Sequence, residues 1–288
     1  MLPTILAAAT LAIYLFMVSP AINPKRWPLA IDLSRQGIGF GLIGLLILIL
    51  LFHQRPEIIP LIVLMIAVHE YGHVLAFRLA GHRQPVFRLA PFGGVAFSER
   101  PAHTQPESAF ISLMGPGFSV VLVLAAMLGI LLLRPDAASI ANGSQPVEAW
   151  RVSVVGILGQ IVLWTAFLNF LNLMPFYPLD GGRAVRSIAS GMGPDFADRL
   201  LYGLTGALVL FGIFKQSIFL ILIGVFGLVA IRNEEPLNRR MPAISSPHAL
   251  LVGGAYFSLL VFLGYFSLPL LYAYFPSLLW LRATLSGG

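Results

Sequence analysis

Long runs of apolar residues, separated by short polar intervals, dominate the chain. Eight such runs lie at 2–20, 36–54, 57–80, 108–133, 151–174, 198–214, 217–231 and 248–280. Most approach or exceed the roughly 20 apolar residues that a helix needs to cross a bilayer. Only Lys215 and Gln216 separate the two shortest runs, a spacing compatible with a tight helical hairpin or with a partly re-entrant segment. The pattern predicts an all-α polytopic membrane protein with about six to eight transmembrane helices.

The composition supports a membrane protein and argues against a nucleic-acid partner. Hydrophobic residues make up 58% of the chain and charged residues 10%, whereas soluble domains carry about 25% charged residues. If the run at 57–80 ends on the cytoplasmic side, 13 of the 18 Lys and Arg residues lie on that side. Such an excess is typical of cytoplasmic loops and accounts for the net charge of +6. The chain is therefore expected to sit in a lipid bilayer, and no feature of the sequence indicates an oligomeric state.

One apolar run carries a cluster of ionisable residues, HEYGH, from His69 to His73. Two histidines at i and i+4 lie on one face of a helix, so both imidazoles can reach a single metal ion. Glu70, about a hundred degrees around the helix, can accept a proton from a metal-bound water. The alternative is that these residues only pack between helices. However, each charged residue at mid-span costs about 2.5–3.5 kcal/mol, which favours a metal as the compensating interaction.

A catalytic zinc ion normally takes three protein ligands and keeps a fourth position for water. The chain has no Cys, so the third ligand must be Asp, Glu or His. Asp180 directly follows an apolar run in the segment LNFLNLMPFYPLDGGR. Pro175 and Pro178 interrupt any helix there, and irregular backbone at membrane depth is tolerated only inside protein or along a watery cavity. Asp180 is thus predicted to be a carboxylate delivered on a broken segment.

The pairing of HEYGH with NLMPFYPLDGG resembles the site-2 protease family of intramembrane zinc metalloproteases, over roughly residues 57–190. The resemblance implies that His69, His73 and Asp180 ligate Zn²⁺ and that Glu70 is the catalytic base. PFGGVAF resembles the family's small membrane-associated β-hairpin after the HExxH helix, and MGPG resembles the Gly-Pro start of its next helix. The polar intervals are too short for a PDZ or CBS domain, so a compact member is expected.

This resemblance divides the chain into N-terminal transmembrane segments at 1–56, a catalytic core at 57–190 and C-terminal transmembrane segments at 191–288. It implies a bacterial or archaeal cell membrane, and the distribution of basic residues predicts a site that opens towards the cytoplasm. The implied activity is cleavage of transmembrane segments of membrane-protein substrates by a zinc-activated water, as in regulated intramembrane proteolysis. One alternative is a metal transporter that uses the same His and Asp residues. Another is a noncatalytic factor with structural zinc, for which Glu70 would have no use.

Several further residues are assigned from their surroundings. Asn172 is a candidate to hydrogen-bond the substrate or the oxyanion, and equally a candidate cap for the broken helix. Gly93 and Gly94 belong to a segment that can offer a strand edge to an unwound substrate by β-augmentation, or simply form a glycine-rich loop. Asn169 is expected to serve helix packing. The remaining histidines are expected to be ordinary surface residues: His53, His82, His103 and His248.

Overall fold

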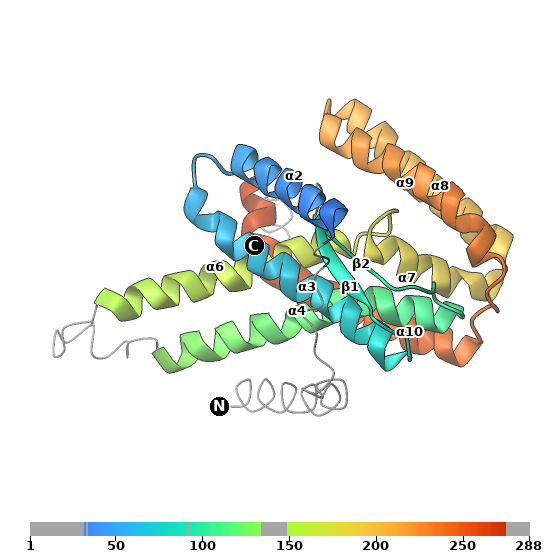
Figure 1. Cartoon of the computed structure of the whole chain (residues 1–288), viewed down its shortest axis with the longest axis horizontal. Coiled ribbons are helices and arrows are strands. Elements are labelled where there is room, and N and C mark those ends of the chain that lie inside the picture. Colours follow the sequence, from blue (N-terminus) through green and yellow to red (C-terminus); the bar gives the residue numbers. More distant parts are fainter. Residues whose placement is uncertain (1–31, 33, 91–92, 134–148, 275–288) are drawn as a thin grey trace, which may run out of the picture.

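The computed structural model describes residues 32, 34–90, 93–133 and 149–274. Within these ranges the chain is mostly helical, with one two-stranded antiparallel sheet, as predicted (Figure 1). The elements, in chain order, are α2 (Arg35–Leu51), the 3₁₀ turn η3 (Pro56–Ile58), α3 (Ile59–Leu79), β1 (Val86–Ala90), β2 (Gly93–Phe97), α4 (Gln105–Leu133), α6 (Ala149–Asn172), α7 (Asp180–Ala189), the 3₁₀ turn η4 (Ser190–Met192), α8 (Pro194–Phe214), α9 (Ile218–Asn238) and α10 (Ser246–Tyr274).

Five helices in the described part are long and apolar enough to cross a membrane, which supports a multi-pass membrane protein. They comprise Pro56–Leu79, Gln105–Leu133, Trp150–Asn172, Pro194–Phe214 and Ser246–Tyr272. The apolar helix α2 is shorter, with 17 residues. The helix α9 begins as an apolar segment and ends in a charged turn. The apolar run predicted at 2–20 lies outside the described residues.

The two short apolar runs form a helical hairpin. The helices α8 and α9 pack side by side (Figure 1), and a turn at Lys215–Ser217 joins them. Gln216 adopts a positive φ of 53° in that turn. Because Gly212 lacks a side chain, α9 can approach closely: a Cβ atom there would lie 2.9 Å from the backbone nitrogen of Ile221. Of the two arrangements that the spacing allowed, the structure shows the hairpin.

The helices α3 and α4 approach each other at two glycines. A Cβ atom on Gly72 would overlap the carbonyl oxygen of Met114 and lie 3.0 Å from the Cα atom of Gly115. The expectation that the Gly-Pro pair starts a helix is wrong, because α4 begins at Gln105 and continues through Pro116. A proline removes one backbone donor from a helix, yet α4 continues across that position, where it packs closely against α3.

The β-hairpin follows α3 directly, and its second strand packs on that helix. Its register pairs Phe87 with Ala96 and Leu89 with Gly94. The carbonyl oxygen of Phe87 accepts a hydrogen bond from the backbone N–H of Asp32 at 2.8 Å. The outer edge of β1 is therefore occupied, while β2 is the strand that lies next to α3.

Candidate metal centre

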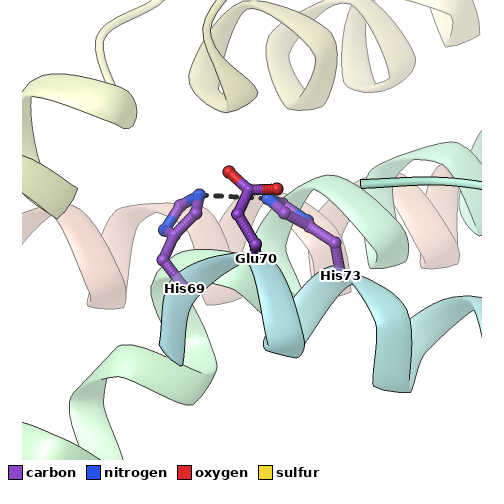
Figure 2. A group of neighbouring side chains, drawn as sticks. All are labelled: His69, Glu70 and His73. Atoms are coloured by element: carbon purple, nitrogen blue, oxygen red, sulfur yellow. Dashed lines mark hydrogen bonds between the residues drawn. The ribbon is translucent and has the colours of Figure 1, made fainter. Parts of the chain in front are cut away.

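His69 and His73 lie one turn apart on α3 and share a face of that helix. Their Nε2 atoms are 3.0 Å apart, and both residues are buried, with 8% and 7% of their surfaces exposed. Figure 2 shows the two rings and Glu70 on the same side of the helix, with the carboxylate between the rings. The i, i+4 spacing thus brings the two imidazoles together as predicted.

Asp180 comes to the same point from a distant part of the sequence. It is the first residue of α7, and its Oδ2 atom lies 3.1 Å from Nε2 of His69 and 3.2 Å from Nε2 of His73. The segment before it, 173–179, forms turns rather than regular helix. The prediction that a broken segment carries this carboxylate agrees with the observed geometry.

Neighbouring helices hold the turn segment 173–179 in place. The hydroxyl of Tyr256 on α10 donates a hydrogen bond to the carbonyl oxygen of Leu173 at 2.8 Å. The backbone N–H of Tyr177 donates to Oγ1 of Thr205 on α8 at 3.3 Å. A Cβ atom on Gly181 would overlap the carbonyl group of Leu173, so the start of α7 can fold back on this segment only with glycine there. These contacts fix the segment that carries Asp180 against α8 and α10.

The three side chains fit a zinc ion in both chemistry and spacing. Zinc binds imidazole nitrogen at about 2.0–2.1 Å and carboxylate oxygen at about 2.0–2.2 Å in tetrahedral geometry, which places neighbouring ligand atoms about 3.3–3.4 Å apart. The observed triangle of Nε2, Nε2 and Oδ2 atoms has edges of 3.0, 3.1 and 3.2 Å. His69, Glu70 and His73 also form a buried group of possible metal ligands, but the triangle with Asp180 is the tighter set.

Hydrogen bonds on the far side of each ring orient both imidazoles towards this triangle. Nδ1 of His69 lies 2.6 Å from Oδ1 of Asn169, and Nδ1 of His73 lies 2.7 Å from the carbonyl oxygen of Ile111. Both partners are acceptors, so each Nδ1 carries the proton and each Nε2 presents its lone pair to the centre. Asn169, expected to serve helix packing, joins α6 to α3, and it does so through a hydrogen bond to a candidate ligand.

Glu70 is buried beside the triangle, and 4% of its surface is exposed. Its Oε2 atom forms no hydrogen bond with any described residue. An unpaired buried carboxylate oxygen is costly, and a water molecule or ion at the centre would satisfy it. Gly94 of β2 lies against this side chain, since a Cβ atom there would overlap the Glu70 carboxylate. Gly93 has a φ of 141° and open space around it.

Asn172, the last residue of α6, also reaches the centre. Its Nδ2 atom donates a hydrogen bond to Oδ2 of Asp180 at 2.8 Å and lies 2.9 Å from Nε2 of His69. Gly115 leaves room opposite, because a Cβ atom there would overlap Nε2 of His73 and lie 2.9 Å from Cε1 of His69. The centre is thus lined by two imidazoles, two carboxylates and an amide, with a glycine facing the rings.

The other histidines lie apart from this centre. His53, His103 and His248 are exposed. The expectation of a surface position is wrong for His82, because 2% of its side chain is exposed and its Nε2 lies 2.6 Å from Oε1 of Glu107. The fold buries this ring between the end of α3 and the start of α4, although it follows the end of an apolar run in the sequence.

Comparisons with known proteins were made for the sequence and for the structure. No protein-family profile matches the sequence. Rip3 of Mycobacterium tuberculosis, named as a candidate zinc metalloprotease, is 33% identical over 185 residues, covering 58% of this chain and 43% of Rip3. A zinc metalloprotease of Methanocaldococcus jannaschii is 26% identical over 177 residues, covering 59% of this chain and 47% of the relative. The chain therefore spans less than half the length of these relatives.

A third sequence relative, from Synechocystis sp., is also named as a candidate zinc metalloprotease. It is 30% identical over 123 residues, covering 43% of this chain and 28% of the relative. The solved structure of a site-2 protease from Methanocaldococcus jannaschii matches with a TM-score of 0.43 and 19% identity, over 71% of this chain and 91% of that one. The assignment of this chain to a class of protein therefore rests on the three sequence relatives. They agree with the zinc metalloprotease that the motifs predict: parts of this chain are related in sequence to proteins named as zinc metalloproteases.

Proposed function

We propose that this protein is an intramembrane zinc metalloprotease that cleaves transmembrane segments of other membrane proteins. The observation that carries the proposal is the buried triangle of His69, His73 and Asp180 atoms, with edges of 3.0–3.2 Å. Two of the three residues lie on α3, a helix long and apolar enough to cross a membrane. The relatives named as zinc metalloproteases support the metal and the reaction class. In this proposal residues 57–190 form the catalytic core.

His69 and His73 would hold the zinc ion through Nε2, and Asp180 through Oδ2. When bound, zinc supplies Lewis-acid chemistry: it lowers the pKa of a water molecule towards about 7 and polarises the scissile carbonyl. Asn169 and the carbonyl group of Ile111 keep both rings in the required tautomer. Asn172 restrains Asp180 through its 2.8 Å hydrogen bond.

Glu70 acts as the general base. It adjoins His69 in the sequence, and its Oε2 atom forms no hydrogen bond with a described residue, so it can accept the proton of the attacking water. The same carboxyl group then donates that proton to the leaving amine. Because Gly94 packs on its side chain, the position of the carboxylate depends on the β-hairpin. With Nε2 of His69 bound to zinc, the second N–H of the Asn172 amide would be available to hydrogen-bond the substrate carbonyl.

The free edge of β2 is the proposed docking site for the substrate. In an antiparallel pair, the N–H and C=O groups of one residue point to the same side. The carbonyl group of Phe87 points towards Asp32 and away from β2. Its partner Ala96 therefore points its own N–H and C=O groups away from β1, and so does Gly94, two residues earlier in the strand. These groups form no turn or inter-element hydrogen bond within the described residues. An unwound substrate that paired with this edge would lie beside Glu70.

The centre is proposed to open towards the cytoplasm, and the distribution of basic residues supports this orientation. The α3 helix ends at Leu79, and Arg83, Arg88 and Arg100 follow it before the next span begins at Gln105. Cytoplasmic loops are enriched in Arg and Lys. Water would then reach the centre from the side on which α3 ends.

The test is a cleavage assay that locates the cut. The purified full-length protein, in lipid bicelles, is incubated with a panel of single-span membrane peptides, and mass spectrometry maps the new termini. The proposal predicts cuts inside the apolar segment, abolished by a zinc chelator and restored by added zinc. Cuts confined to the polar flanks would show a protease that does not act within the membrane. No zinc-dependent cut in any peptide would contradict the proposed activity.

A further inference from the structure

A polar cavity lies away from the metal centre, at the end of two helices that are candidate membrane spans. It has a volume of about 330 Å³ and is lined by Ala80, Gly81, His82, Arg83, Ser98, Glu99, Arg100 and His103. These residues follow the end of α3 at Leu79, follow the end of β2 at Phe97, or precede the start of α4 at Gln105. Since both helices are candidate membrane spans, the cavity lies at the level where the bilayer meets water.

Two arginines of this cavity lack an ion-pair partner. Arg83 and Arg100 are exposed and form no ion pair or side-chain hydrogen bond with any residue in the described ranges. By contrast, the guanidinium group of Arg186 is paired with Asp198. With Glu99 also in the lining, the fully charged side chains sum to a net charge of +1. Among the lining residues, two guanidinium groups therefore face one carboxylate.

The inner wall of the cavity is fixed by His82. Its Nε2 atom lies 2.6 Å from Oε1 of Glu107, and its Nδ1 atom lies 3.2 Å from Oγ of Ser98. The ring also stacks on His103, with centroids 5.8 Å apart. Both ring nitrogens are thus engaged within the protein. His82 shapes the cavity, and the arginines at its rim carry the charge that a ligand would meet.

We propose that this cavity binds the phosphodiester group of an anionic membrane lipid, with Arg83 and Arg100 as the donors. Guanidinium groups match phosphate oxygens in geometry and charge. Basic pockets beside membrane-spanning helices are suited to anionic headgroups. A phosphodiester is an anion that the two guanidinium groups can bind, and the position at the span ends gives a lipid access. Inorganic phosphate shares the recognition chemistry and is the other source.

The test measures binding by the full-length protein in neutral detergent with isothermal titration calorimetry. The probes are dihexanoyl-phosphatidylglycerol and, separately, inorganic phosphate. The test variant is Arg83→Gln/Arg100→Gln. The matched control is Arg199→Gln/Arg240→Gln, which removes two exposed arginines elsewhere and changes the net charge equally. Unchanged melting temperatures confirm that both variants are folded.

The test variant is expected to bind the lipid at least about tenfold more weakly, because hydrogen bonds between charged groups are lost. The control should bind like the wild type. Tighter binding of inorganic phosphate than of the lipid, with the same dependence on the two arginines, would support the anion site and assign its occupant as free phosphate. Equal losses in both double variants, or no binding of either probe to the wild type, would overturn the proposal.

Discussion

Oδ1 of Asn169 lies 2.6 Å from Nδ1 of His69, although the two residues are 100 positions apart in the sequence. The orientation of the Asn169 amide is fixed, because its Nδ2 donates a hydrogen bond to the carbonyl oxygen of Thr165 at 2.8 Å. The oxygen therefore faces His69 and accepts its Nδ1 proton. This contact leaves Nε2 as the nitrogen that faces Asp180.

Replacing Asn169 should weaken zinc binding without removing a ligand. Outer partners of metal-bound histidines typically contribute about 10- to 100-fold to metal affinity, so Asn169→Leu is expected to raise the zinc dissociation constant by that factor. Asn169→Asp keeps an acceptor and should retain more of the affinity. Competition with a chromophoric chelator measures the constants. An unchanged constant in Asn169→Leu would show that the hydrogen bond does not orient the ligand.

Asp180→Ala removes one of the three proposed ligands, and a larger effect is expected. The zinc dissociation constant should rise by more than the about 10- to 100-fold expected for an outer partner. Asp195→Ala is a suitable control, because Asp195 lies on α8 with 61% of its side chain exposed. Both variants are analysed by the same chelator competition. Full zinc affinity in Asp180→Ala would leave the Glu70 carboxylate as the third ligand instead.

Gly94→Ala should impair catalysis through Glu70. The added methyl group would overlap the Glu70 carboxylate and displace it, and a misplacement of about 1 Å can cost about 10²-fold in rate. Zinc content should stay unchanged, because no ligand moves. Gly156→Ala is the control, since a Cβ atom there meets nothing within 4 Å. Cleavage rates and zinc content of the two variants are compared, and equal rates would refute the contact between hairpin and base.

Asp198 forms the most buried ion pair outside the centre among the described residues. Its Oδ1 atom lies 2.6 Å from Nη2 of Arg186, and the two side chains are 5% and 3% exposed. Removing one partner of such a pair costs about 3–5 kcal/mol, because the other charge is left buried. Asp198→Leu should lower the free energy of unfolding in SDS by this amount. Asp195→Leu removes a partner of an exposed ion pair and should change the free energy of unfolding little. Similar losses of stability in the two variants would refute the role of burial.

Much of the centre was predictable because helical geometry fixes it locally. A helix places His69 and His73 on one face whatever the tertiary structure, and prolines before Asp180 mark a break in an apolar run. The β-hairpin was predictable from its glycines and from the family resemblance. The hairpin of α8 and α9 was one of two arrangements that the spacing allowed.

Other features depend on how the helices pack, which sequence spacing does not reveal. The facing of Asn169 towards His69 depends on the rotation of α6 against α3. Nδ1 of His73 hydrogen-bonds the backbone carbonyl of Ile111, so the type of side chain at position 111 does not indicate the contact. The burial of His82 and the continuation of α4 through Pro116 likewise follow from tertiary contacts. A polar amide within an apolar span was the one signal that pointed to Asn169.

The most direct test of the central claim is the Glu70→Gln variant, with zinc content and substrate cleavage measured on the same preparation. The proposed roles separate the two quantities, since the base acts on water while His69, His73 and Asp180 hold the metal. The expected result is one zinc ion per chain, as in the wild type, with cleavage slowed by about 10²- to 10⁴-fold. Cleavage at the wild-type rate by the zinc-loaded variant would contradict the account.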